Sequence, residues 1–84
     1  MNPNIQGQQI QTRKALLVFL KVVAPPLVFY VDNPDETYLE IRNIMANAKP
    51  QMPKIIERLG KGPLKKLAVF DTQIAGVAIQ EEPA

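Results

Sequence analysis

The side chains that could carry chemistry here are carboxylates, amines, guanidinium groups and the hydroxyls of Tyr and Thr, because the sequence contains no Cys, His or Ser. Their absence excludes a disulfide framework, a Cys or Ser nucleophile, an imidazole base and a Cys/His zinc site. An enzyme hypothesis would rest on Asp71 and Tyr30, and neither has an evident catalytic neighbour in the sequence. The sequence therefore predicts a protein that is not an enzyme and that needs no cofactor.

Four carboxylates lie close together in the sequence and invite comparison with a hard-cation site; they are Asp32, Asp35, Glu36 and Glu40. Calcium loops need five or more oxygen ligands arranged around a glycine turn, and this segment lacks that pattern. Helix capping explains the same residues better, since Asn33, Pro34 and Glu36 match the N-cap, N1 and N3 positions of a capping box. We predict no metal site.

Positive charge is concentrated in one segment, although the net charge is only +2. Residues 49–66 carry six Lys and Arg against Glu57, whereas residues 67–84 carry three carboxylates and no cation. A basic hairpin over Lys54–Lys66 is a candidate contact for phosphates or a partner protein, through Lys54, Arg58, Lys61, Lys65 and Lys66. Nucleic acid is the alternative partner and not the preferred one, because no aromatic side chain lies in the segment to stack on bases.

The glycines within this segment, Gly60 and Gly62, flank Lys61 and precede a proline. A phosphate-binding loop requires a longer glycine loop, a Lys-Ser/Thr pair and a following helix, none of which is present. We interpret Gly60-Lys61-Gly62-Pro63 as a hairpin tip.

Two apolar segments rich in β-branched and aromatic residues, 14–23 and 27–31, predict a pair of strands that reverse at Pro25-Pro26. Alternation along the first strand places apolar side chains on both of its faces. A single helix in so short a chain covers only one face, so the other requires barrel closure or a second subunit. The candidate oligomer face comprises Leu17, Phe19, Val23, Val28 and Tyr30.

The elements that follow are a helix and three strands. The helix is expected to run from Pro34 to about Ala48 and to be stopped by Pro50. Residues 51–60 fit either a short helix or a strand, and we favour the strand because a glycine-bearing loop and another apolar segment follow. Residues 66–71 and 74–82 predict two more strands around an Asp71-Thr72-Gln73 turn.

The predicted fold is α+β in the order ββαβββ: a β-hairpin, one α-helix, and a three-stranded antiparallel meander. The helix is expected to pack on one face of the sheet or on a small barrel. Residues 1–13 are predicted to form a flexible N-terminal tail, because they are polar and contain few large aliphatic side chains. Residues 14–82 then form a single α+β domain.

The residues Tyr38-x-x-Ile41-Arg42-x-x-Met45-Ala46, Pro50-x-Met52 and Lys65-Lys66-x-x-Val69, with Ile74, resemble a small uncharacterised protein family of cyanobacteria and plastids. The similarity covers roughly residues 25–82. It is interrupted at Pro53, a position that the resemblance would place within an uninterrupted strand. The resemblance implies the same hairpin, helix and meander order. It implies no activity, so it transfers no functional residue.

The function that the sequence favours is contact with other proteins, beginning with self-association. Domains of about 80 residues without disulfides or metals often depend on oligomerisation, and the first strand has two apolar faces. We predict a homo-oligomer, a dimer or larger. No membrane partner is expected, because the apolar segment 15–31 is interrupted by Lys21 and Pro25-Pro26. The lack of Cys suits the cytoplasm.

Overall fold

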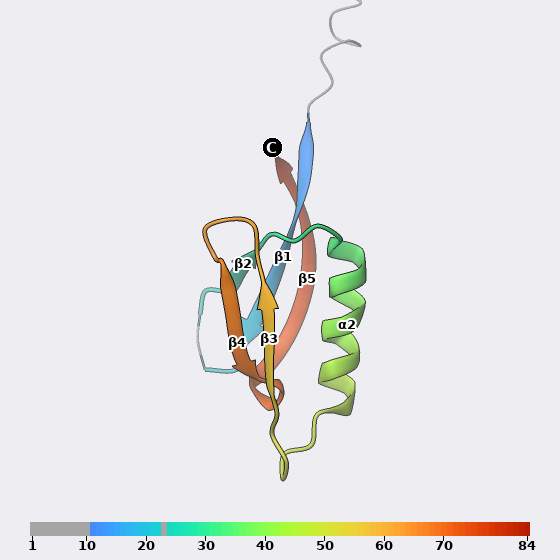
Figure 1. The fold of residues 1–84 in the computed structure, drawn as a ribbon, viewed down its shortest axis with the longest axis vertical. Helices are drawn as coiled ribbons and strands as arrows, with labels where there is room; N and C mark the ends of the chain where they lie inside the picture. Colours follow the sequence, from blue (N-terminus) through green and yellow to red (C-terminus); the bar gives the residue numbers. More distant parts are fainter. Residues whose placement is uncertain (1–10, 23) are drawn as a thin grey trace, which may run out of the picture.

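The computed structural model describes residues 11–22 and 24–84, which form one α-helix, a 3₁₀ turn and five strands in two antiparallel sheets (Figure 1). The predicted α+β class is confirmed, and the order of the elements agrees with ββαβββ. In chain order they are β1 (Thr12–Leu20), β2 (Leu27–Phe29), α2 (Pro34–Asn47), β3 (Ile55–Leu59), β4 (Lys66–Phe70), the 3₁₀ turn η1 (Asp71–Gln73) and β5 (Ile74–Pro83).

The longer sheet has the strand order β2-β1-β5, so β1 is its central strand. Leu16 lies opposite Phe29 on one side and Ile79 on the other, which fixes the register of both antiparallel pairs. An aliphatic strand fits this central position, because both of its edges are paired.

The predicted three-stranded meander is wrong, because β5 pairs with β1 and not with β4. The β3–β4 hairpin does form, with Ile56 opposite Val69. Residues 51–60, for which the sequence allowed either a helix or a strand, therefore contain the strand that we favoured. The residues after β4 explain the difference in pairing. Asp71 to Gln73 form a 3₁₀ turn, which redirects the chain toward β1 and prevents a tight β4–β5 hairpin.

The helix α2 begins as the sequence predicts. Asn33 is its N-cap: the Asn33 side-chain oxygen accepts the Glu36 N–H at 3.4 Å, and the Asn33 amide donates to the Glu36 carboxylate at 3.1 Å. Pro34 occupies the first turn, where its missing N–H costs nothing. The helix ends at Asn47, one residue before the predicted end, and Ala48 has an extended backbone ahead of Pro50.

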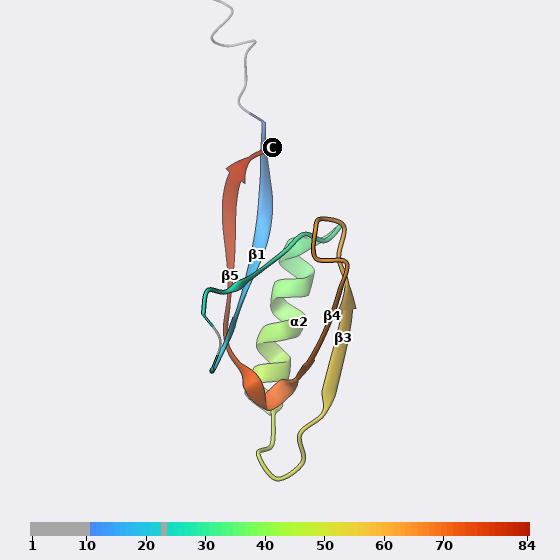
Figure 2. The same ribbon diagram turned by 90° about the vertical axis from the view of Figure 1, so that its left-hand side faces the viewer.

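Both α2 and the β3–β4 hairpin lie on the same side of the three-stranded sheet, as the two perpendicular views show (Figures 1 and 2). The core lies between these layers, where Val18 of β1, Ile41 of α2 and Ile74 of β5 pack together. The described residues bury only six apolar side chains: Ala15, Leu16, Val18, Phe29, Ile41 and Ile74. Eight large apolar side chains of the described residues are exposed, so the core leaves much apolar surface uncovered.

Several predicted boundaries move. The strand β1 begins at Thr12, which pairs with Pro83, so Thr12 and Arg13 belong to the sheet and not to a tail; residues 1–10 lie outside the described residues. β2 is shorter than predicted and ends at Phe29. The sheets remain two separate antiparallel sheets, so the small-barrel alternative is not supported. In the part of the chain that is described, no helix has the length and apolarity needed to cross a bilayer.

Candidate functional site

The first candidate surface is the side of the three-stranded sheet that faces away from α2 and the hairpin. Side chains of directly opposed residues share one face of a sheet, and Leu17 lies opposite both Val28 and Ala78, while Phe19 lies opposite Gly76. We call this set of five residues the sheet face. Phe19 is 38% exposed and Val28 41%, and neither α2 nor the β3–β4 hairpin lies on this side of the sheet (Figure 2).

The Phe19 ring lies along Gly76. A Cβ built on Gly76 would stand 3.6 Å from Phe19 Cδ1, an ordinary van der Waals distance, so the ring packs over the neighbouring backbone. The aromatic side chain covers the glycine, as in cross-strand aromatic–glycine pairs of other sheets. The sheet face is therefore a formed surface with no charged member, since its other residues are Leu, Val and Ala.

Of the residues predicted to form an oligomer face, the structure brings Leu17, Phe19 and Val28 together. Val23 lies outside the described residues. Tyr30 follows β2 and enters a polar cluster: its hydroxyl donates to Glu82, and the Arg13 guanidinium lies 4.2 Å above its ring centroid. Tyr30 therefore borders the sheet face and does not extend its apolar surface.

This polar cluster of Arg13, Tyr30 and Glu82 joins the ends of β1 and β5 to the segment after β2. Arg13 Nε donates to Glu82 Oε1 at 2.9 Å, and Arg13 Nη2 donates to the Tyr30 hydroxyl at 3.3 Å. The hydrogen bond from Tyr30 lowers the pKa of the Glu82 carboxyl below its ordinary value of 4.5, and Arg13 adds to the effect. The same bond raises the pKa of the Tyr30 hydroxyl above 10.0.

The second candidate surface is the outer side of the β3–β4 hairpin. Alternation places Ile56, Arg58, Leu67 and Val69 toward the core and leaves the other strand residues outside. We call the outside set the hairpin face; it comprises Ile55, Glu57, Leu59, Lys66, Ala68 and Phe70. Ile55 is 64% exposed and Leu59 73%, so this face is more open than the sheet face.

The five predicted basic contacts do not form one continuous row. Arg58 points inward and pairs with Glu40 of α2 at 3.4 Å, and Lys61 pairs with Asp32. Lys66 stands on the hairpin face, while Lys54 precedes β3 at the opposite end of the hairpin. Lys65 approaches the Lys61 carbonyl at 3.4 Å. Two of the five charges are thus matched by carboxylates, and the others are spread over the length of the hairpin.

Asp71, the other residue of the enzyme hypothesis, is 6% exposed and holds the base of the hairpin. Its carboxylate accepts the Lys54 N–H at 2.9 Å, and its own N–H donates to the Lys54 carbonyl at 2.8 Å. Tyr30 lies at the tip of the hairpin, at the opposite end from Asp71. A Cβ built on Gly62 in this tip would overlap the Tyr30 ring. The two side chains therefore occupy separate places and form no acid–base pair.

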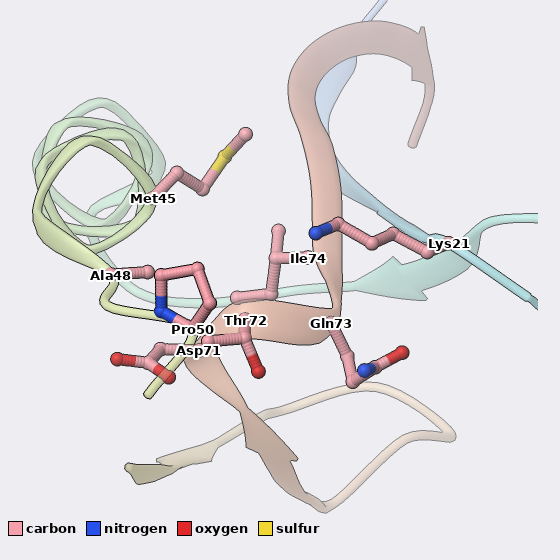
Figure 3. A pocket seen from close by; sticks show the side chains of 8 residues that line it. All are labelled: Lys21, Met45, Ala48, Pro50, Asp71, Thr72, Gln73 and Ile74. Atoms are coloured by element: carbon pink, nitrogen blue, oxygen red, sulfur yellow. The ribbon is translucent and has the colours of Figure 1, made fainter. Parts of the chain in front are cut away.

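A pocket of about 380 Å³ lies beside Asp71, between the end of α2 and the start of β5 (Figure 3). The Lys21 ammonium points over Ile74 toward Met45, and the Asp71 carboxylate lies on the other side of the pocket. Ala48 and Pro50 complete an apolar wall. No ion pair between Lys21 and Asp71 spans this pocket, and among the described residues no three acidic side chains gather to hold a metal ion.

The hairpin face is the feature that sequence reasoning missed. The signal was present as alternation, since Ile55, Glu57 and Leu59 occur at every second position and Ile56 and Arg58 fill the positions between. The summed charge of residues 49–66 does not show which face each side chain occupies, so it gives no sign of this apolar surface.

Comparisons of the chain with protein-family models, with curated proteins and with solved structures gave no match. The family resemblance stated above therefore stays a prediction.

Proposed function

We propose that this protein is a non-catalytic module that assembles with a second copy of itself through the sheet face. The observation that supports the proposal is the exposure of Phe19 and Val28 on the side of the sheet opposite α2 and the hairpin. Burying apolar surface stabilises association by roughly 25 cal/mol per Å², before the entropic cost of binding is subtracted.

A second copy is the partner that suits this surface because the surface is uncharged. A two-fold interface brings the same patch together from both subunits, so any charge on its axis would face an identical charge. The sheet face contains only Leu, Phe, Val, Gly and Ala. Two such sheets can pack face to face, in the way that aligned sheets form sandwiches. The absence of cysteine suits the reducing cytoplasm, where we expect the assembly to form.

The test is the oligomeric state of the full chain, measured by sedimentation velocity over a range of micromolar concentrations. We expect a dimer for the native sequence and a monomer for Val28→Asp, because each subunit would place an unpaired carboxylate in the interface. The matched control is Leu59→Asp, which makes the same change on the hairpin face and is expected to leave the dimer intact.

Circular dichroism establishes that each variant is folded before its mass is interpreted. A native chain that sediments as a monomer throughout the range would overturn the proposal. So would a dimer that Leu59→Asp dissociates and Val28→Asp does not, since the hairpin face would then be the self-association surface.

A further inference from the structure

The strand β5 has one unpaired edge, because β1 is its only neighbour in the sheet. The Ala84 N–H donates to the Gln11 carbonyl at 2.9 Å, so the even-numbered residues in the regular part of β5 direct their main-chain groups toward β1. Val77, Ile79 and Glu81 therefore direct their N–H and C=O groups away from β1. No described main-chain group pairs with them on that side.

Both ends of this free edge are marked in the sequence. Pro83 occupies an odd-numbered position, where its missing N–H removes no hydrogen bond from the pairing with β1. At the other end, the register with β1 skips Ala75, which forms a bulge. The regular free edge therefore covers residues 76–82, and Ile79 lies at its centre.

The other outer edges of the two sheets are protected against pairing, whereas this one is not. β2 is three residues long, β4 begins at Lys66, and the Arg58 side chain on β3 donates to the Glu57 carbonyl at 2.7 Å. Short strands and charged side chains are the usual protections of a sheet edge. Residues 75–80 contain no charged side chain and no proline. This edge is therefore the one suited to an added strand.

A second copy of the chain matches the edge in register. Ala75 and Pro83 are equally distant from Ile79 in the sequence. A two-fold axis through Ile79, perpendicular to the sheet, would pair Val77 with Glu81 of the partner subunit. The bulge would then lie opposite the partner's Pro83, so the two positions that cannot pair coincide.

Charge also favours an antiparallel second copy. Glu81 lies near the C-terminal end of β5, whereas Lys21 lies beside its start, where the ammonium points over Ile74 (Figure 3). Neither Glu81 nor Lys21 belongs to an ion pair among the described residues. Antiparallel pairing brings each carboxylate toward the ammonium of the other copy, and parallel pairing would bring the two carboxylates together.

The neighbouring charges leave these two groups available. Lys14 lies opposite Glu81 on β1, and its ammonium pairs with Asp35 at 3.0 Å. The Asp71 carboxylate lies across the pocket from Lys21 and forms no ion pair with it.

We propose that the free edge of β5 pairs antiparallel with the same edge of a second copy, which joins two three-stranded sheets into one continuous sheet. This contact does not involve the sheet face and does not depend on it. Main-chain hydrogen bonds replace bonds to water, so each adds little net free energy. We therefore expect edge pairing at millimolar concentrations, above the micromolar range in which the sheet face pairs.

The test is amide hydrogen exchange measured by NMR on the full chain, both native and with Val28→Asp, which disrupts the sheet face. In both chains we expect Val77 and Ile79 to exchange about tenfold more slowly at millimolar concentration than in dilute solution, because an amide bonded between copies exchanges only when it is released. The Glu57 N–H, which faces away from β4 on the free edge of β3, is the internal control and should exchange equally throughout.

Glu81→Pro removes an outward N–H and places a ring at the edge without breaking the pairing with β1. It should raise the dissociation constant of the edge contact about tenfold. Glu57→Pro makes the same change on the free edge of β3 and should leave that constant unchanged. Glu81→Lys should also weaken the contact, and Lys21→Glu added to it should restore the contact. Circular dichroism establishes that each variant is folded.

Several outcomes would overturn the proposal. One is exchange at Val77 and Ile79 that does not depend on concentration in either chain. Another is protection that Glu57→Pro abolishes and Glu81→Pro does not. In mixtures of isotope-labelled and unlabelled chains, proton contacts between Glu81 of both copies would show parallel pairing and contradict it. An unrelated peptide of alternating Thr and Val that protects these amides equally well would exclude the second copy as the specific occupant.

Discussion

The sheet face and the hairpin face are both apolar and both exposed, yet they differ in charge. Phe19 and Val28 stand among uncharged neighbours, whereas Ile55 and Leu59 alternate with Glu57, and Leu59 lies opposite Lys66. Burying an exposed apolar surface is favourable in free energy, and the charges around that surface determine which partner can cover it. The self-association that we propose therefore uses the sheet face, which has no charged member.

The two sheets also differ in how firmly they are held. The three-stranded sheet has a central strand paired on both edges, while the hairpin is attached through its two ends and through inward side chains such as Ile56 and Val69. A two-stranded hairpin is marginal alone, so its stability depends on its contact with the larger sheet. Substitutions at that contact show whether the two surfaces belong to one cooperative unit.

The largest effect is expected at Phe29, which is fully buried on β2 and lies beside Gly60 of the hairpin. Phe29→Ala should lower the free energy of unfolding by about 3 to 5 kcal/mol, because it removes a core ring and leaves a cavity. Urea unfolding followed by circular dichroism measures the loss. Phe70→Ala, at a ring that is 47% exposed on the hairpin face, is the control and should cost far less. Equal losses would show that Phe29 does not join the sheets.

A smaller effect is expected at Gly60, where the hairpin tip approaches β2. A Cβ there would lie 2.6 Å from Phe29 Cε1 and would overlap the Leu64 carbonyl oxygen. Gly60→Ala should therefore cost about 1 to 3 kcal/mol of stability, the usual range for overpacking. Gly76→Ala makes the same change on the sheet face at an ordinary contact distance, and thermal melts should show no loss. A loss at Gly76 as large as at Gly60 would contradict this distinction between the two sheets.

The smallest effect is a pH dependence at the polar cluster where the sheet and the hairpin tip meet. The folded-state pKa of Glu82 is lowered, so its contribution to stability is present above the unfolded value and is lost as pH falls through the folded value. The folded-state pKa of Tyr30 is raised, so its contribution is lost as pH rises through the folded value. Melting temperatures across the acid range should fall less steeply for Glu82→Gln than for the native chain. If the two curves of melting temperature against pH were parallel, the polar cluster of Arg13, Tyr30 and Glu82 would not contribute to the loss of stability in acid.

The local signals of the sequence were sufficient for the elements and insufficient for their pairing. Asn33, Pro34 and Glu36 predicted the start of α2 because a cap depends only on residues within one turn. Alternation showed that residues 74–82 form a strand, but the period does not identify the neighbouring strand. The pairing of β5 with β1 depends on η1, whose 3₁₀ geometry the Asp71-Thr72-Gln73 sequence did not reveal.

The candidate surfaces were predicted to a similar extent. Two apolar faces on β1 predicted a surface containing Leu17, Phe19 and Val28, because alternation alone determines which side chains share a face. The basic residues were predicted by proximity in the sequence, and in a strand proximity places neighbours on opposite sides. Arg58 consequently points toward Glu40, whereas Lys66 points away from the core.

The pairing of β1 with β5 also imposes an order of assembly on the growing chain. β3 and β4 are joined by a short loop and can pair as soon as both have been synthesised. β1 must wait for β5, which follows every other described element, so one edge of the central strand stays open until then. We expect the nascent chain to fold its hairpin early and to complete the sheet last. The sheet face accordingly exists only in the finished molecule, so the self-association that we propose would follow folding.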